Sequence, residues 1–213
     1  MKFVDYEIHT GKENMQIDSD LLNNAISSKS EEAIFRLYGW SPKCVSLGRN
    51  QKDDFINCKI DYVRRLTGGR ALLHDDEITY SYISPISIIP DGESIISSYK
   101  YISGILIDFF KTLGVLLEFG ENKKISTHYD YCMLLSTGAD VCYKGKKIIG
   151  SAQFRKNGYL LQHGSILFGY DKEFLEKLFK EDVKGITTVK EILPNITKEE
   201  FILKLKKYIL SQT

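Results

Sequence analysis

Cysteine is scarce in this sequence, and its pattern excludes two common classes of protein. The 213 residues include four cysteines, at positions 44, 58, 132 and 142. No two of them form a Cys-x-x-Cys pair or the spacing of a zinc site, and a chain of this length needs no disulfides to stabilise its core. We therefore expect reduced thiols and no bound metal.

The sequence also lacks an excess of either positive or negative charge. The 29 Lys and Arg residues nearly balance the 28 Asp and Glu residues, which leaves a formal net charge of +1. Such a balance gives no overall attraction to nucleic acid or to a membrane surface. No apolar run approaches the ~20 residues of a transmembrane helix, and no signal-peptide pattern opens the chain. We expect a cytoplasmic protein that is a monomer, with its partners recognised through local sites.

The ordinary hydrophobic content of 43% and the absence of linkers or repeats indicate one domain over residues 1–213. Apolar residues at helical spacing predict a helix near residues 17–25 and another over 102–113 that ends at Gly114. Asp171, Thr188 and Thr197 each stand where an N-cap would begin a further helix.

Strand-forming residues predict a sheet. Residues 32–48 favour a hairpin around the Trp40-Ser41-Pro42 turn, and residues 62–66 and 78–84 are typical of strands. Residues 139–169 predict a meander with tight turns at Lys144-Gly145 and Asn157-Gly158. This order of elements indicates an α+β fold with a mixed, largely antiparallel sheet flanked by helices.

The segment of residues 64–75, Arg-Arg-Leu-Thr-Gly-Gly-Arg-Ala-Leu-Leu-His-Asp, is the most informative part of the chain. Gly68 and Gly69 allow a positive φ and the close approach of another group to the main chain. Its guanidinium groups can donate to an anionic or carbonyl-rich ligand, and its imidazole titrates near neutrality. The side chains concerned are Arg64, Arg65, Arg70 and His74. The alternative is a simple glycine turn with solvated arginines.

A catalytic thiol needs a neighbouring cation, because a free cysteine with a pKa near ~8.5 is mostly protonated at neutral pH. Cys132 lies in a polar stretch, residues 126–133, that is typical of a loop. Cys142 lies in a probable strand and faces either core or solvent, whereas Cys44 has the pattern of a packing residue. Taken alone, the residues favour an inert, exposed thiol at Cys132 over a catalytic one, and Cys142 is its closer rival.

Residues 146–153 form a second candidate site. Lys147 follows a tight turn and begins a strand that Gly150 interrupts, and a glycine within a strand often marks the close approach of a ligand. The alternative is a solvated lysine before an ordinary strand. His163 ends the next strand, where it serves as a structural hydrogen-bonding residue or lies beside the glycine-rich segment.

Taken in order, these motifs resemble the biotin and lipoate protein ligase superfamily. The resemblance covers most of the chain. It is carried by Phe35-Arg36-Leu37-Tyr38-Gly39-Trp40, Ser46-Leu47-Gly48, residues 64–75 with Thr79-Tyr80-Ser81, Lys147-Ile148-Ile149-Gly150-Ser151-Ala152-Gln153 and Gln162-His163-Gly164-Ser165-Ile166-Leu167. It implies the catalytic-domain fold of that superfamily, with an acyl-lysine pocket beneath the glycine-rich segment.

Within the superfamily, the chain is similar to the cysteine-dependent octanoyltransferases. The ATP-dependent lipoate ligases usually carry a third glycine where Arg70 stands here, and commonly a small accessory domain, which we do not expect in this chain. The octanoyltransferases place their nucleophile fifteen residues before the motif lysine, a position that Cys132 occupies relative to Lys147. The resemblance thus implies Cys132 and Lys147 as catalytic residues. It implies a substrate-binding set of Arg64, Arg65, Gly68, Gly69, Arg70, His74, Gly150, Ser151, Ala152 and His163.

The activity implied is the transfer of an octanoyl group from octanoyl-acyl carrier protein to a lipoyl-domain lysine through a cysteine thioester, with no cofactor. Acceptors of this kind are the glycine cleavage H protein and the E2 subunits of 2-oxoacid dehydrogenases. Three alternatives stay open: an ATP- and Mg-dependent lipoate ligase, a lipoyl amidotransferase, and a non-catalytic module that binds lipoyl domains or carrier protein. The last is kept open because the residues after Cys132 depart from the octanoyltransferase pattern.

Overall fold

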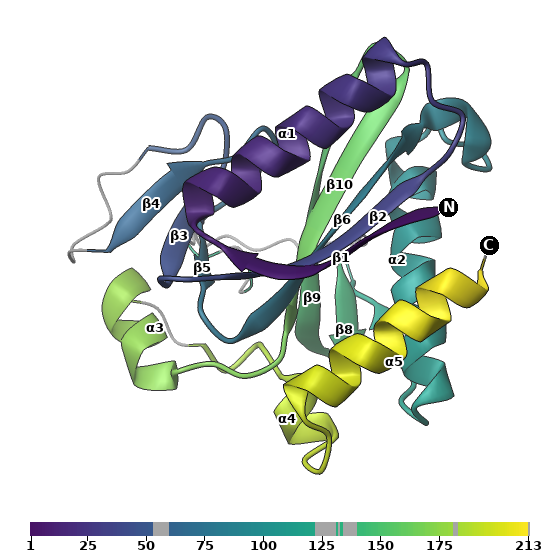
Figure 1. Cartoon of the computed structure of the whole chain (residues 1–213). Helices are drawn as coiled ribbons and strands as arrows, with labels where there is room; N and C mark the ends of the chain where they lie inside the picture. The colour runs from purple at the N-terminus through teal and green to yellow at the C-terminus, as the bar shows by residue number, and fades with distance from the viewer. Residues whose placement is uncertain (53–59, 122–130, 132, 134–139, 181–182, 213) are drawn as a thin grey trace.

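A computed structural model describes residues 1–52, 60–121, 131, 133, 140–180 and 183–212 (Figure 1). Its strands are β1 (Lys2–His9), β2 (Ile34–Trp40), β3 (Cys44–Leu47), β4 (Asp61–Arg64), β5 (Leu72–His74), β6 (Glu77–Pro85), β7 (Glu118–Phe119), β8 (Val141–Tyr143), β9 (Lys146–Lys156) and β10 (Tyr159–Leu167). Its helices are α1 (Gly11–Ser27), the 3-10 turn η1 (Ile86–Ile88), α2 (Ile95–Thr112), α3 (Lys172–Phe179), α4 (Val189–Ile192) and α5 (Lys198–Ser211).

The strands form two sheets. The larger sheet has the order β1-β2-β6-β10-β9-β8-β7, and among its described strand pairs only β1–β2 is parallel. The smaller sheet has the order β4-β3-β5, with β3 parallel to β4 and antiparallel to β5. The predicted α+β class with a mixed, largely antiparallel sheet is therefore confirmed.

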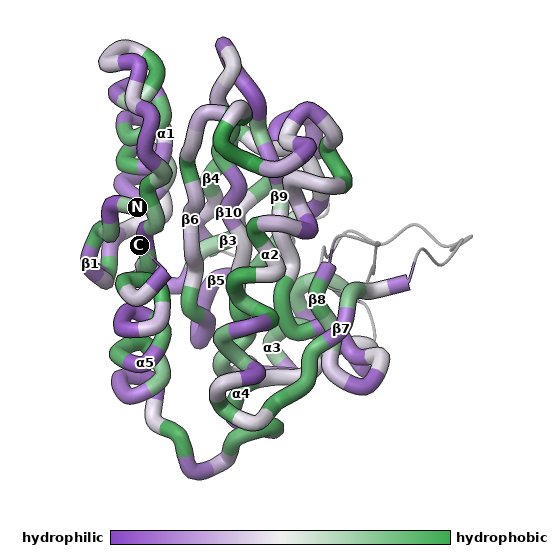
Figure 2. The backbone as a smooth tube through the Cα atoms, turned by 90° about the vertical axis from the view of Figure 1, so that its right-hand side faces the viewer, coloured by the Kyte–Doolittle hydropathy of each residue, from purple (hydrophilic) through white to green (hydrophobic). Residues whose placement is uncertain are grey.

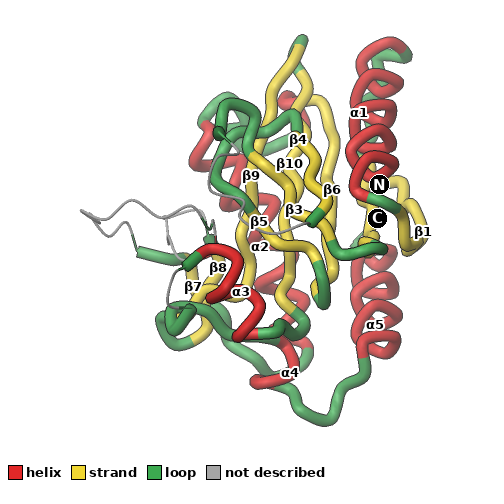
Figure 3. Tube along the Cα trace, turned by 90° about the vertical axis from the view of Figure 1, so that its left-hand side faces the viewer, coloured by secondary structure: helices red, strands yellow, loops and turns green. Residues whose placement is uncertain are grey.

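Helices cover both faces of the larger sheet. Helix α1 lies along one side and α2 along the other (Figures 2 and 3), while α5 packs against β1 and α2. Because side chains alternate along a strand, β6 sends Tyr80 and Tyr82 into the main core with α2 and Ile83 into a separate cluster beneath α1. Thr79 and Ser81 alternate with these tyrosines, so the face toward α1 is polar at one end.

Local sequence signals predicted the two hairpin turns, three N-caps and the end of α2 correctly. Lys144, Gly145, Asn157 and Gly158 all have positive φ, as the two predicted hairpin turns require. The predicted N-caps are confirmed: the Asp171, Thr188 and Thr197 side chains each accept a hydrogen bond from a backbone N–H in the first turn of α3, α4 and α5. Helix α2 ends before Gly114, which has a φ of +77°.

The predicted hairpin over residues 32–48 is wrong. Both of its strands exist, but β2 pairs with β1 and β6 in the larger sheet, and β3 pairs with β4 and β5 in the smaller one. Because both edges of β2 are already occupied, β3 cannot pair with it. The Trp40–Pro42 turn therefore carries the chain from one sheet to the other. Among the described helices, none is long and apolar enough to cross a membrane.

Candidate active site

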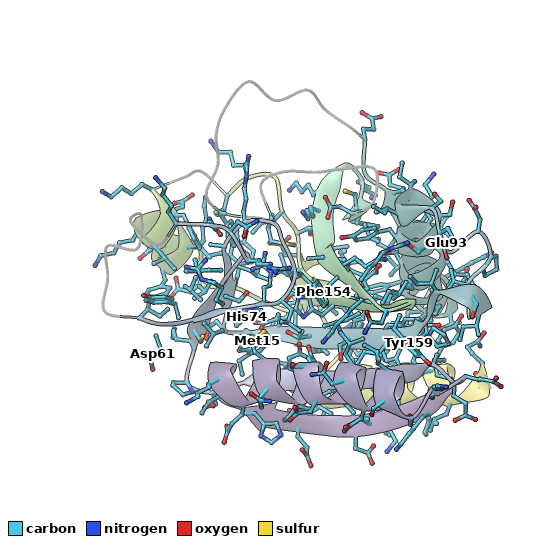
Figure 4. All side chains as sticks on the ribbon, turned by 90° about the horizontal axis from the view of Figure 1, so that it is seen from above. Met15, Asp61, His74, Glu93, Phe154 and Tyr159 are labelled. Carbon is cyan, nitrogen blue, oxygen red and sulfur yellow. The ribbon has the colours of Figure 1, made fainter. Side chains whose placement is uncertain are left out.

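A pocket lies between α1 and the polar end of the sheet face that α1 covers. About 390 Å³ of space between its lining atoms is free of protein, and part of that space is open to solvent. In Figure 4 the Met15 side chain of α1 lies next to His74, and both residues line this pocket. The lining residues are Met15, Tyr38, Trp40, Ser46, Arg65, Leu72, His74, Thr79, Gly150, Ser151, Ala152, His163, Gly164 and Ser165. The pocket thus brings together six residues of the predicted binding set: Arg65, His74, Gly150, Ser151, Ala152 and His163.

Arg65 organises the glycine-rich segment. Its buried guanidinium donates from Nη2 to the carbonyl oxygens of Gly68, at 3.0 Å, and Arg70, at 2.7 Å. Nη1 donates to Ser46, both to its carbonyl oxygen and to its hydroxyl, and Nε donates to the Thr67 hydroxyl. These bonds use the whole fork of donors on the protein itself. Arg65 therefore shapes the loop, whereas the sequence had suggested a direct ligand contact.

His74 lies at the floor of the pocket, stacked on Trp40 with ring centroids 3.7 Å apart. Its Nδ1 is 2.7 Å from Oε1 of Glu77, and its Nε2 is 2.8 Å from the Ser46 hydroxyl. Burial lowers the pKa of His74, although the neighbouring Glu77 carboxylate acts in the opposite direction. The imidazole is therefore neutral at physiological pH and serves as a structural hydrogen-bonding group.

His163 joins the loop to α1. Its Nε2 is 2.7 Å from the Thr67 hydroxyl, and its Nδ1 is 3.3 Å from Oδ2 of Asp18. Burial alone would raise the pKa of Asp18, but the hydrogen bond from His163 and the charge and hydrogen bond of Arg36 lower it on balance. Arg36 donates to Asp18 at 2.8 Å, and Tyr38 donates its hydroxyl to the same carboxylate. The carboxylate is thus fully buried, ionised and surrounded by donors.

The glycines of the loop leave donors available. Gly69 has a φ of +94°, and its carbonyl oxygen lies so close to Gly48 that a Cβ added there would be 1.9 Å away. Within the described part of the chain, the N–H groups of Gly68 and Gly69 have no protein acceptor. Arg64 is not among the residues that line the pocket, and it donates to the Gly48 carbonyl. The buried Nη1 of Arg70 has no hydrogen-bond partner among the described residues.

Lys147 is buried, with 2% of its surface exposed. Its Nζ forms an ion pair with Oδ1 of Asp140 at 3.0 Å. Gly150 makes this position possible, since a Cβ there would lie 2.7 Å from the Met133 sulfur and 3.0 Å from Cε of Lys147. The Lys147 side chain therefore packs beside Gly150 and Met133, and the solvated turn lysine that the sequence also allowed is excluded.

Ser151 is fixed by a chain of hydrogen bonds on β6 and β10. The Tyr80 hydroxyl is 2.8 Å from the Ser151 hydroxyl, and Gln162 donates to Tyr80 at 2.8 Å. Burial raises the pKa of Tyr80, so the phenol stays protonated. Ser151 is consequently held in place at the edge of the pocket.

The structure describes two of the three candidate cysteines, Cys44 and Cys142. Cys132 lies outside the described residues. Cys44 is buried, and burial raises the pKa of its thiol to about 12, which suits the packing role predicted for it. Cys142 is also buried, on β8 opposite Lys147 in the β8–β9 register. Among the described residues, no group of three or more His, Cys, Asp or Glu side chains is arranged to hold a metal ion.

Sequence reasoning missed the residues behind the pocket, chiefly Asp18, Ser46, Glu77 and Asp140. A signal existed for the first of them. On α1 the buried positions are Gly11, Asn14, Asp18, Leu22 and Ala25, so two polar residues occupy the stripe that an amphipathic helix buries. Buried polar groups are normally hydrogen-bonded, and their presence on that stripe indicates a polar network beneath the helix.

Comparisons with known proteins show which family this chain resembles. The family described as lipoyl protein ligase A/B catalytic domain matches residues 10–210. The chain is 38% identical to octanoyltransferase LipM of Carboxydothermus hydrogenoformans, over 84% of this chain and 68% of that protein. Its identity to octanoyltransferase LipM of Clostridioides difficile is 40%, over 81% of this chain and 67% of that protein. The chain thus matches about two thirds of the length of these relatives.

Solved structures share the fold. Lipoate-protein ligase A bound with ATP superposes with a TM-score of 0.74 at 20% identity, covering 98% of this chain and 83% of that one. LipL1 of P. falciparum in complex with lipoate gives the same TM-score at 21% identity, covering 99% of this chain and 61% of that one.

Proposed function

The chain belongs to the lipoyl protein ligase A/B catalytic-domain family, and from that premise we propose that it transfers octanoyl groups from acyl carrier protein to lipoyl-domain lysines in lipoate biosynthesis. The observation that carries the proposal is the identity of 38–40% to octanoyltransferases over about four fifths of the chain. The reaction needs no cofactor, because the donor thioester already carries an activated acyl group.

Cys132 is the proposed nucleophile. Its thiolate attacks the carbonyl carbon of the octanoyl thioester, the bond from that carbon to the carrier sulfur breaks, and the carrier thiolate leaves and takes up a proton. The ε-amine of the acceptor lysine then attacks the acyl-enzyme, the bond to Cys132 breaks, and the thiolate is regenerated as the amine loses its proton. Tyr131 and Met133, its described neighbours in the sequence, are both buried, and Met133 packs beside Gly150.

Lys147 is the proposed partner of this thiolate. A buried ammonium group close to a thiol favours the charged form of sulfur and thus its nucleophilicity. Its place beside Gly150 and Met133 supports this role. The carboxylate of Asp140, 3.0 Å from Nζ, orients the ammonium group and compensates its charge while the sulfur is not a thiolate.

The developing oxyanion of each step requires donors that are already in place. The N–H groups of Gly68 and Gly69 have no protein acceptor within the described part of the chain, and the carbonyls of Gly68 and Arg70 are held by Arg65. This loop is therefore suited to stabilise the oxyanion. Nη1 of Arg70, which has no hydrogen-bond partner among the described residues, is a further donor for the acyl carbonyl or the carrier.

Intact-mass spectrometry tests the proposal directly. After incubation with octanoyl-acyl carrier protein, we expect the enzyme to gain the mass of one octanoyl group, and neutral hydroxylamine to remove it as it removes a thioester. Cys132→Ser should show no hydroxylamine-labile adduct. Cys142→Ala is the matched control, because it removes the rival thiol and leaves Cys132 in place.

A second pair of incubations separates the alternatives. Lipoate with ATP should give no pyrophosphate and no lipoylated acceptor if the chain is an octanoyltransferase, whereas a lipoate ligase would give both without Cys132. Octanoyl transfer from one lipoyl domain to another, in preference to transfer from carrier protein, would identify an amidotransferase. A labile adduct that persists in Cys132→Ser would refute the assignment of the nucleophile.

A further inference from the structure

Two chains of hydrogen bonds run in parallel behind the pocket, and both begin at Arg65. In the first, Nη1 of Arg65 donates to the Ser46 hydroxyl, which lies 2.8 Å from Nε2 of His74, and Nδ1 of His74 lies 2.7 Å from Glu77. We name this chain of four residues the β5 relay. Its carboxylate is 2% exposed and its imidazole 3%.

In the second chain, Nε of Arg65 donates to the Thr67 hydroxyl, which lies 2.7 Å from Nε2 of His163. Nδ1 of His163 lies 3.3 Å from Asp18 on α1. We name this chain the α1 relay. The two relays share the same order of groups, from guanidinium to hydroxyl to imidazole to buried carboxylate, although their residues come from different elements.

The direction of each bond follows from what each group can donate. A guanidinium only donates and a carboxylate only accepts, so Arg65 and the carboxylates fix both ends of each relay. In their neutral forms, His74 and His163 must then carry their protons on Nδ1. Each hydroxyl, which already accepts from Arg65, is left with its own hydrogen to donate to an unprotonated Nε2.

Both relays reach the Gly68-Gly69 loop through Arg65, and Thr67 of the α1 relay also belongs to the glycine-rich segment itself. The guanidinium that donates hydrogen bonds to the two hydroxyls also donates, from Nη2, to the carbonyl oxygens of Gly68 and Arg70. Rotation of the guanidinium would break bonds to both relays and to the loop at once. The orientation of the loop N–H groups is therefore linked to the tautomers of two histidines.

We propose that Asp18 and Glu77 are positioning residues of the acyl transfer, a role that rests on the proposed function. Each carboxylate holds its histidine as the Nδ1–H tautomer. Each histidine orients the hydroxyl that anchors Arg65, and Arg65 sets the geometry of the Gly68-Gly69 loop. Neither Asp18 nor Glu77 is among the residues that line the pocket.

Thr67→Val tests the α1 relay with little change of shape, because it removes the hydroxyl and keeps the side-chain volume. We expect kcat for octanoyl transfer to fall about 100-fold, the loss that a misplacement of ~1 Å can cause in a positioned site. KM for the carrier protein should change less than about threefold, since the donor surface is untouched. Thr67→Ser, which restores the hydroxyl, should return kcat to within a few-fold of the original value.

Asp18→Asn tests the end of the relay, with Asp20→Asn on the exposed side of the same helix as the matched control. An amide nitrogen facing His163 would donate to Nδ1 and move the proton to Nε2. Nitrogen-15 NMR of histidine side chains reads this tautomer without any turnover. We expect Nδ1–H signals for His74 and His163 in the original protein and in the Asp20→Asn variant, and an Nε2–H signal for His163 in Asp18→Asn.

The activity measurement and the NMR measurement test the proposed function and the relays independently. If the protein transfers no octanoyl group, the proposed function is wrong, but the tautomers still report whether the relays exist. An Nε2–H tautomer of His163 in the original protein would overturn the relay. An undiminished kcat in Thr67→Val, in a protein that does transfer octanoyl groups, would overturn the positioning role.

Discussion

The buried ion pair between Lys147 and Asp140 allows a test of how much these two side chains contribute to stability and whether both are needed for activity. The two side chains are 2% and 6% exposed, and the charged atoms are 3.0 Å apart. Three variants address it: Asp140→Asn, which keeps the shape of the side chain, Lys147→Met, which keeps most of its length, and the double variant. Each single change removes one charge of this ion pair and leaves the other charge buried.

The magnitude follows from the geometry. Opposite charges 3.0 Å apart attract by about 5–6 kcal/mol at an effective dielectric constant of ~20. Loss of hydration offsets most of that gain, but removal of one partner from a buried pair still costs ~3–5 kcal/mol, because the other charge remains buried. For a protein of this length, such a cost corresponds to a fall in Tm of about 6–20 °C. The double variant removes both charges, so it should be more stable than the sum of the singles predicts, by up to ~3 kcal/mol.

Urea unfolding measures these free energies through the fluorescence of Trp40, which is the single tryptophan of the chain and lies in the pocket. We expect both single variants to unfold at lower urea concentration and the double variant to recover part of the loss. None of the three should transfer octanoyl groups, because each has lost the lysine or the group that orients it. If the loss of unfolding free energy in the double variant equals the sum of the losses in the two single variants within ~0.5 kcal/mol, the two side chains do not act as a pair.

Two further perturbations bear on the loop and the histidine beneath it. Burial lowers the pKa of His74, so the unfolded chain binds its proton more readily. Stability should therefore be complete above the unfolded pKa of ~6.5 and decline as the pH falls below it toward the folded pKa. Urea midpoints between about pH 7.5 and 5.5 measure this decline, and an equal slope in His74→Gln would contradict it. Gly48→Ala places a Cβ 1.9 Å from the Gly69 carbonyl oxygen, whereas Gly68→Ala meets no atom within 4 Å. Thermal unfolding should show a large loss of Tm for the first and a small one for the second; equal losses would refute the steric argument.

Local features of the fold were predictable because their causes are local. An N-cap side chain bonds to a backbone N–H two or three residues away, and Asn157-Gly158 adopts positive φ within its own turn. The hairpin over residues 32–48 failed for the opposite reason. Strand pairing depends on which partners reach each edge, and β2 is paired with β6, a strand some forty residues further along the chain.

The candidate site was predictable to the same degree. The motif residues Arg65, His74, Gly150 and His163 do meet at one pocket, as the resemblance implied. Their roles were not readable, because a guanidinium between two strands can donate to a ligand or to its own loop with equal chemical ease. Only the distances from Arg65 to Gly68 and to the other acceptors show that it donates to the protein.

Helix α1 shows why the polar end of this sheet had to be built as a network. Four donors converge on the Asp18 carboxylate, from Arg36, Tyr38, Ser81 and His163. A carboxylate without them would not stay ionised at this depth, since burial disfavours the charged form. An apolar residue at position 18 would leave those four donors without their acceptor. The helix therefore keeps one charge on its buried stripe to satisfy the network on which His163 and the loop depend.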